Sequence, residues 1–177
     1  MTAQHADARA RSSHGATDAP RVLDGIACLE DEAAIQGARN RQALAWWHGA
    51  RGGNVAPAAQ AFDVLDLAPI ASHLALLDVI GEGADFHHRL IGTAIVEHLG
   101  VDGTGTPLSA YDRESEFSRR TWHILGLVVS QRRPVLNQPG YARVAGREHR
   151  RHESLTLPLV GADGRVERVL SVLDFLN

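Results

Sequence analysis

The feature that most constrains this fold is the order in which strand-like and helix-like segments follow one another. Two strand-like runs are predicted at residues 73–80 and 85–91, around the turn GEGA. Helical patterns follow, and then three more strand-like runs at 134–143, 148–159 and 165–176. This order predicts an α+β fold: a five-stranded antiparallel sheet with helices packed on one face.

Two longer helices are predicted on either side of the first strand pair. Apolar residues recur at helical spacing from about Ala33 to Arg51, and Gly52-Gly53 ends this N-terminal helix. Residues 114–131 form a second amphipathic helix, whose apolar side must lie on the sheet. The residues expected on that side are Phe117, Thr121, Ile124, Leu125 and Val128.

Two short helices carry recognisable end signals. Asp63 is expected to cap a helix that runs through Leu67, and Pro69 stops it. Thr93 is expected to cap a second helix, which runs to Leu99.

The chain divides into a tail and a single domain. Residues 1–33 lack hydrophobic periodicity and are rich in Ala, Asp, Arg and Ser, which predicts a flexible tail. Residues 34–177 then form one domain that includes the N-terminal helix. No apolar run approaches the roughly 20 residues that span a bilayer, and the N-terminus lacks the apolar core of a secretory signal. A cytoplasmic protein without membrane contact is expected.

The hairpin register predicts which side chains of the first two strands are buried. If GEGA is the turn, Ile80 faces Asp85. Leu77, Val79, Phe86, His88 and Leu90 then share one face, which is the better core candidate. Asp78 and Arg89 share the other face, where a cross-strand ion pair is the simplest interpretation. The alternative is that Arg89 anchors a ligand carboxylate or a partner protein.

Composition excludes several function classes. A formal net charge of −3 disfavours a dedicated nucleic-acid binder, which needs a basic face. All 18 basic residues are Arg, so phosphate-binding loops and Schiff-base chemistry that need a lysine are excluded. Cys28 is the only cysteine, which rules out an intramolecular disulfide and any multi-cysteine metal motif. No metal site is predicted.

An ordered series of short motifs runs through the chain. It includes Trp47, Arg51-Gly52, Pro57, the Asp63 helix, Leu76-Leu77-Asp78, Phe86, the R-x-x-G-T junction from Arg89 to Thr93, and G-x-D-x-T-G from Gly100 to Gly105. Leu157-Pro158-Leu159 and Asp163-Gly164 continue it near the C-terminus. With Val64 and Trp46 as departures, this series resembles a proteobacterial single-domain family of the PAS domain superfamily over residues 35–176. The order and spacing of the motifs carry the resemblance, because each motif alone is a turn, a cap or an apolar pair.

The resemblance implies the PAS fold, with the sheet in the order 2-1-5-4-3 and a cavity between sheet and helices. It implies a stand-alone sensory or regulatory protein that binds a small ligand or a signalling partner and carries no catalytic activity. The cofactor stays open, because PAS domains bind haem, flavin, small acids or nothing. The residues expected to line the ligand site are Phe86, His88, Leu90, Thr93, Tyr111, Trp122, His123 and Ser171. Asp78, Arg89 and Trp47 are candidates for partner contact or for a structural role.

Two cofactor hypotheses follow from the resemblance. His123 lies on the long helix, which supplies the iron ligand in haem-binding PAS domains, so it is the best single haem candidate. Flavin photochemistry in this fold needs a cysteine on a central helix, whereas Cys28 falls in the predicted tail. A blue-light receptor is therefore not expected.

Two other functions and an assembly state complete the hypotheses. A cone-shaped α+β hydratase or isomerase would use one buried, unpaired acid, such as Asp78 or Asp174. Asp174, near the C-terminus, is expected instead to lie at an edge of the sheet or to face solvent. A ligand-free protein-interaction module would differ from a sensor only in having a filled core. A homodimer through the Ile35–Trp47 helix is expected.

Overall fold

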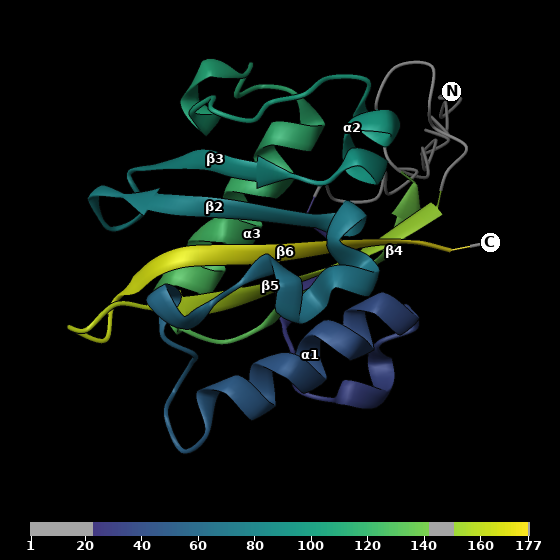
Figure 1. The fold of residues 1–177 in the computed structure, drawn as a ribbon. Helices are drawn as coiled ribbons and strands as arrows, with labels where there is room; N and C mark the ends of the chain where they lie inside the picture. Colours follow the sequence, from purple (N-terminus) through teal and green to yellow (C-terminus); the bar gives the residue numbers. More distant parts are fainter. Residues whose placement is uncertain (1–22, 142–150, 177) are drawn as a thin grey trace, which may run out of the picture.

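A six-stranded antiparallel sheet organises the computed structural model, which describes residues 23–141 and 151–176. The strand order is β1-β4-β5-β6-β2-β3 (Figure 1). The strands are β1 (Ile26–Cys28), β2 (Leu74–Ile80), β3 (Asp85–Ile91), β4 (Val135–Tyr141), β5 (Arg151–Val160) and β6 (Val166–Leu176). The predicted parts of two strands between residues 142 and 150 lie outside the described residues.

The predicted fold class is confirmed, and the strand count is corrected from five to six. The five predicted strands keep their expected neighbours, and β1 adds a sixth strand beside β4. Secondary structure therefore begins at Ile26, before the domain boundary predicted at residue 34. A three-residue edge strand is too short to show alternation, which is why the sequence pattern missed it.

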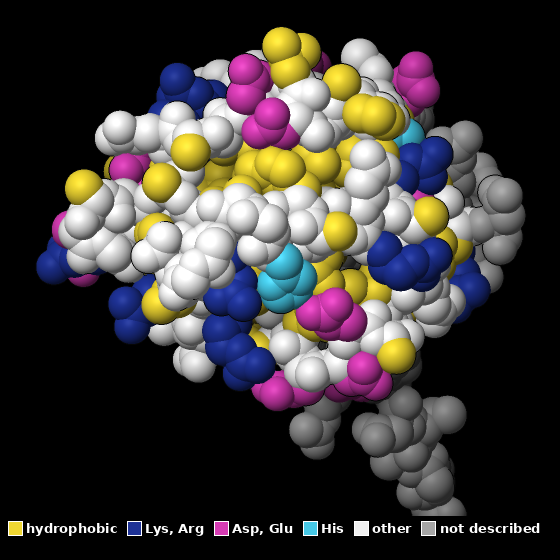
Figure 2. Space-filling view, turned by 60° about the horizontal axis from the view of Figure 1, so that its bottom comes forward, with side chains coloured by type: hydrophobic (Ala, Val, Ile, Leu, Met, Phe, Trp, Pro, Cys, Tyr) yellow, Lys and Arg dark blue, Asp and Glu magenta, His cyan; other side chains and the backbone are white. Residues whose placement is uncertain are grey.

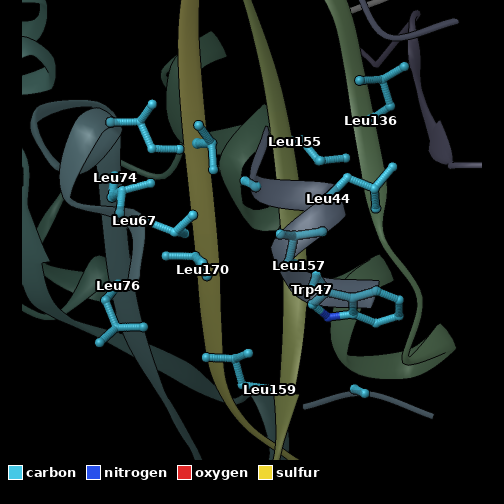
Figure 3. Close-up of a cluster of buried hydrophobic side chains, with 14 of the residues drawn as sticks. Leu44, Trp47, Leu67, Leu74, Leu76, Leu136, Leu155, Leu157, Leu159 and Leu170 are labelled. Atoms are coloured by element: carbon cyan, nitrogen blue, oxygen red, sulfur yellow. The ribbon is translucent and has the colours of Figure 1, made fainter. Parts of the chain in front are cut away.

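One face of the sheet, here called the outer face, is covered by α1 (Ala38–Arg51) and the 3-10 helix η3 (Val64–His73). Figure 3 shows Leu44 and Trp47 of α1 against the leucines of β5, with Leu67 of η3 beside β2 and β6. These residues belong to a cluster of buried hydrophobic side chains on the outer face of the sheet. Its leucines are Leu44, Leu67, Leu74, Leu76, Leu136, Leu155, Leu157, Leu159 and Leu170.

The opposite, inner face is covered by α3 (Glu116–Gln131), with α2 (Thr93–Leu99) at one end. Leu125 and Val128 of α3 pack there with Phe86 of β3 and Val169 of β6. Helices therefore lie on both faces of the sheet and not on one (Figure 1). In residues 23–141 and 151–176, no helix combines the length and apolar character that crossing a bilayer requires.

Of the two predicted helix N-caps, the one at Asp63 is confirmed and the one at Thr93 is wrong. The Asp63 side chain accepts a hydrogen bond from the Leu65 amide at 2.9 Å. The expectation that Pro69 stops this helix was wrong, because η3 continues past a non-helical turn at Leu67 and through Pro69 to His73. The cap of α2 is Gly92, and Thr93 is its exposed first residue. Gly92 is buried against the Ser72 carbonyl, where a Cβ would collide, so the chain needs glycine at the cap. Phe117, expected to face the sheet, is 42% exposed at the start of α3.

Candidate functional site

A strip of polar side chains crosses the inner face of the sheet beneath α3. Thr156 of β5 faces Val135 of β4 and Ser171 of β6, and its hydroxyl lies 3.0 Å from that of Ser171. One step along, Asn137 of β4 faces Ser154 of β5 and donates to its hydroxyl at 3.4 Å. We call these four residues the polar strip. Only Ser171, the strip residue on β6, is more than 9% exposed.

Arg120 places a positive charge beside this strip. Its guanidinium donates to the Asn137 side-chain oxygen at 2.5 Å and to the Asp24 carbonyl at 3.3 Å. Burial lowers the pKa of Arg120, while Glu116 and Asp24 act in the opposite direction. The group stays protonated at neutral pH, because the ordinary pKa of arginine is so high. This end of the strip therefore presents an amide and a guanidinium, with the acidic Glu116 and Asp24 nearby.

Two pairs of predicted ligand-binding residues are already packed against each other near β3. The rings of Phe86 and Trp122 meet edge-to-face with centroids 5.6 Å apart, and the Arg113 guanidinium carbon lies over the Trp122 ring, 4.1 Å from its centroid. The His88 ring lies 5.8 Å from that of Tyr111, and its Nδ1 lies 2.8 Å from the Thr106 carbonyl oxygen.

These pairs lie away from Ser171 along the sheet. Ser171 faces Ala75 on β2, whereas Phe86 faces Val79, four residues further along the same strand. Four strand residues span about 13 Å. Phe86 and Trp122 therefore lie apart from Ser171, whereas His88 faces Leu77, two residues from Ala75.

Leu90 and His123 are not brought together with the other predicted site residues. Between Leu76 and Leu77 the register with β3 shifts by one residue, so Leu90 faces Leu76 and packs with the outer-face cluster. The expectation that Leu90 shares a face with Phe86 was wrong, because a β-bulge inverts the alternation. His123 is half-buried on α3 and precedes buried Leu125 by two residues, about 200° around the helix.

Asp78, Arg89 and Trp47 have clear structural partners. The Asp78 carboxylate accepts from Arg89 and from Arg168, each at 3.1 Å, so the predicted cross-strand ion pair is confirmed. Arg89 occupies the bulge and its side chain is 54% exposed. Trp47 is 3% exposed and donates from Nε1 to the Pro158 carbonyl at 2.9 Å.

Sequence reasoning missed a pair of buried carboxylates on the outer face. Glu153 of β5 and Asp174 of β6 are direct cross-strand partners and are 0% and 2% exposed. The Gln36 and Gly37 amides and the Asn40 side chain donate to Glu153 at 2.9–3.0 Å. Arg39 donates to Asp174 through its backbone amide at 2.8 Å and its guanidinium at 2.7 Å.

This arrangement corrects the expectation that Asp174 faces solvent. The available signal was an acidic residue at facing positions of two adjacent apolar strands, which needs a compensating partner when buried. Both acids named for a hydratase-like enzyme, Asp78 and Asp174, carry ion pairs. The unpaired acid which that hypothesis requires is therefore not found at either position.

Histidine and aromatic rings cluster at the end of the sheet nearest these carboxylates. The Phe175 ring lies 4.6 Å from that of His98 and 5.6 Å from that of His73. Burial and the charge of Arg39 lower the pKa of His73, and Asp174 partly opposes them. Across residues 23–141 and 151–176, no three His, Cys, Asp or Glu side chains are placed to hold a metal ion.

The surface around α1 bears on the predicted dimer. The apolar side of α1, including Leu44 and Trp47, is buried on the chain's own sheet. Figure 2, which brings this side forward, shows a band of hydrophobic side chains among scattered arginine and acidic residues, with no large patch of one charge. A dimer through α1 would have to use the outward side of the helix.

Comparisons with known proteins give a family and a structural neighbour. A family model described as a PAS domain matches residues 35–174. The PAS domain of BvgS from Bordetella pertussis is similar in structure, with a TM-score of 0.43 and 16% sequence identity over 59% of this chain and 76% of that chain. No curated protein matches the sequence.

Proposed function

Because this chain belongs to the PAS domain family, a family of sensory and regulatory modules, we propose that it binds a small polar ligand at the polar strip and passes the bound state to a signalling protein. We also propose that the protein has no catalytic activity. The proposed ligand site lies between α3 and the central strands, with Thr156 and Ser171 as its floor and Arg120 at its side.

The observation that carries this proposal is the contrast between the two faces of the same strands. On the outer face β5 presents Leu155 and Leu157, whereas on the inner face it presents Ser154 and Thr156. A strand buried on both sides is normally apolar on both. A hydroxyl can donate one hydrogen bond and accept two, so the bond between Thr156 and Ser171 leaves capacity for another polar group.

The charge beside the strip favours an anionic ligand. A guanidinium that is already half-buried loses little further hydration when a carboxylate approaches, and charge-assisted hydrogen bonds are stronger than neutral ones. A small carboxylate that also carries hydroxyl groups could pair its carboxylate with Arg120 and its hydroxyl groups with Thr156 and Ser171. The aromatic pair of Phe86 and Trp122 would then close the far end and not contact the ligand.

A thermal-shift assay with a panel of mono- and dicarboxylates tests this proposal, with inorganic phosphate as the competing anion. A carboxylate at 100 times its Kd adds about 2.7 kcal/mol, or roughly 5–10 °C in Tm for a chain of this size. The double substitution T156V/S171A replaces both members of a hydroxyl pair and should preserve folding but remove the shift. S130A, an exposed hydroxyl on α3, is the matched control and should retain it.

If no carboxylate raises the Tm, and T156V/S171A has the same Tm as the parent, a ligand-free protein-interaction module becomes the better hypothesis. In that case Arg89 and its neighbours on the outer face would carry the function alone. We also propose a cytoplasmic homodimer. A strict monomer by light scattering at high concentration would contradict the dimer.

A further inference from the structure

We propose that the signalling partner docks through a basic amphipathic helix on a surface formed by α1 and the turn that begins η3. The surface consists of three apolar side chains, Trp46, Phe62 and Leu65, bordered by the carboxylates of Asp63 and Asp66. We call these five residues the docking surface. This inference rests on the proposed function, because it names where the partner binds and with what chemistry. It can nonetheless be tested in ligand-free protein.

Two aromatic rings form the base of the docking surface. The rings of Trp46 and Phe62 meet edge-to-face with centroids 5.2 Å apart, and both side chains are partly buried against the outer-face cluster. The core therefore fixes one side of each ring, while the rest of the ring reaches the surface. Rings that are already held in place lose little conformational freedom when a partner covers them. Tryptophan is also enriched among the residues that dominate binding energy at interfaces.

Leu65 is an apolar side chain that the fold does not bury. It is 73% exposed, the highest value among the large hydrophobic residues of the described chain. The Leu65 amide donates to Asp63, and the next residue, Asp66, accepts from Trp46 Nε1 at 3.4 Å, so this turn holds Leu65 near the aromatic pair. A polar side chain would serve the fold equally well here. Covering Leu65 would add an apolar contact that the free chain lacks.

The two carboxylates give the docking surface its charge. Asp63 and Asp66 are both exposed, and neither forms an ion pair within residues 23–141 and 151–176. The basic residues in the last turn of α1 are engaged elsewhere: Arg51 lies over a buried tryptophan ring, and His48 pairs with a glutamate of the preceding 3-10 helix. The docking surface therefore attracts a positively charged partner and repels a negatively charged one.

A second copy of the chain fits the docking surface poorly. In a two-fold symmetric dimer, the same surface patch of each chain meets its own counterpart. Asp63 and Asp66 would then lie opposite the same two carboxylates of the other copy. Like charges brought together at an interface are strongly unfavourable. The proposed homodimer would therefore have to use another part of the surface, which leaves the docking surface to a partner of opposite charge.

The part of α1 beside Trp46 favours a helical partner. Three and four residues after Trp46, the helix carries Gly49 and Ala50, which are both exposed. Residues at these spacings lie on the same side of a helix, and a Cβ on Gly49 would meet no atom within 4 Å. A second helix can approach α1 closely there and place its apolar side on Trp46 and Leu65. Lysine or arginine residues beside that apolar side would then pair with the two carboxylates.

Two synthetic amphipathic helices serve as probes of the docking surface. One contains leucine and lysine, and the other carries glutamate in place of every lysine. Titration of the lysine probe into isotope-labelled, ligand-free protein should shift the NMR signals of amides at residues 45–50 and 61–67. The glutamate probe should leave these signals unchanged, because its charge is repelled. Fluorescence anisotropy of the dye-labelled lysine probe then gives its Kd.

Three variants separate the apolar contribution from the charge. L65Q removes the exposed apolar side chain, and D63N/D66N removes both charges while asparagine keeps the N-cap of η3. Each should raise the Kd of the lysine probe about tenfold. The Tm should stay at the parental value, because every replaced side chain is exposed. E114Q/E167Q is the matched control: it also removes two exposed carboxylates, from the loop before α3 and from β6, and should keep the parental Kd.

Several results would overturn the docking surface. They are the absence of any shift, shifts centred on another surface, equal binding of the two probes, and a parental Kd in L65Q and D63N/D66N. If L65Q instead lowers the mass measured by light scattering, the surface joins two copies of the chain and the proposed partner is wrong. Binding of the lysine probe without any Tm increase from a carboxylate would sink only the ligand site. A Tm increase without probe binding would sink only the docking surface.

Discussion

Replacing Gly37 by alanine tests the contact between α1 and the sheet with a single methyl group. The added Cβ would lie 2.5, 2.7 and 2.9 Å from the Oδ2, Cβ and Cγ atoms of Asp174, which is 2% exposed and has no open space to move into. Overpacking of this kind costs about 1–3 kcal/mol. Displacing the carboxylate also weakens hydrogen bonds from Arg39 to a charged group, worth about 1.5–3 kcal/mol.

Because part of this cost is relieved by relaxation, we expect a loss of about 2–4 kcal/mol in the free energy of unfolding. That corresponds to a fall in Tm of roughly 5–15 °C. Urea denaturation followed by tryptophan fluorescence measures it, since Trp47 lies on the same helix.

The matched control is Gly49→Ala on the same helix. A Cβ there meets no atom within 4 Å, and alanine has the higher helix propensity. This variant should gain up to about 1 kcal/mol. If Gly37→Ala is as stable as the parent, or if both variants shift in the same direction, the close contact with Asp174 is refuted.

Three further predictions concern stability and the outer face. The pKa of His73 is lowered in the folded state, so the unfolded chain binds the proton first as the pH falls. The free energy of unfolding should therefore decrease as the pH drops below about 6.5. Urea denaturation at a series of pH values should show that H73Q lacks this part of the pH dependence. An identical pH profile in H73Q would contradict the assignment. W47F leaves the Pro158 carbonyl without its donor and should cost about 1–3 kcal/mol by urea denaturation; an unchanged midpoint would show that this hydrogen bond is unimportant. R89A should lower the free energy of unfolding by less than about 1 kcal/mol, because the Arg89 side chain is half-exposed and Asp78 keeps its ion pair with Arg168. Binding to a signalling partner, measured by pull-down, should weaken in this variant. Global unfolding of R89A would instead favour a structural role for Arg89.

The strand order was predictable because it depends on local signals. The turn at GEGA placed Ile80 opposite Asp85, as the structure has it, and short turns fixed the C-terminal strands as neighbours. Leu90 shows where this reasoning fails: a bulge at Arg89 shifts the register, and nothing in the alternation of DFHHRLI marks it. One inserted residue was enough to move Leu90 to the opposite face.

The site was less predictable than the fold, because its groups meet only in three dimensions. Thr93 looked like a helix cap by type, but the space beside Ser72 requires glycine one residue earlier. Glu153 and Asp174 are 21 residues apart in sequence, and their compensating groups lie more than 110 residues away. Local propensity carries no information about such a contact. By contrast, the alternation that places Ser171 and Thr156 on one face can be worked out once the strand register is known.

Native mass spectrometry of protein purified from its own host tests the central claim most directly. We expect one small carboxylate bound per 19.1 kDa chain, an added mass that is lost in T156V/S171A and retained in S130A. Only the mass of the bare chain in all three proteins would contradict a ligand at the polar strip.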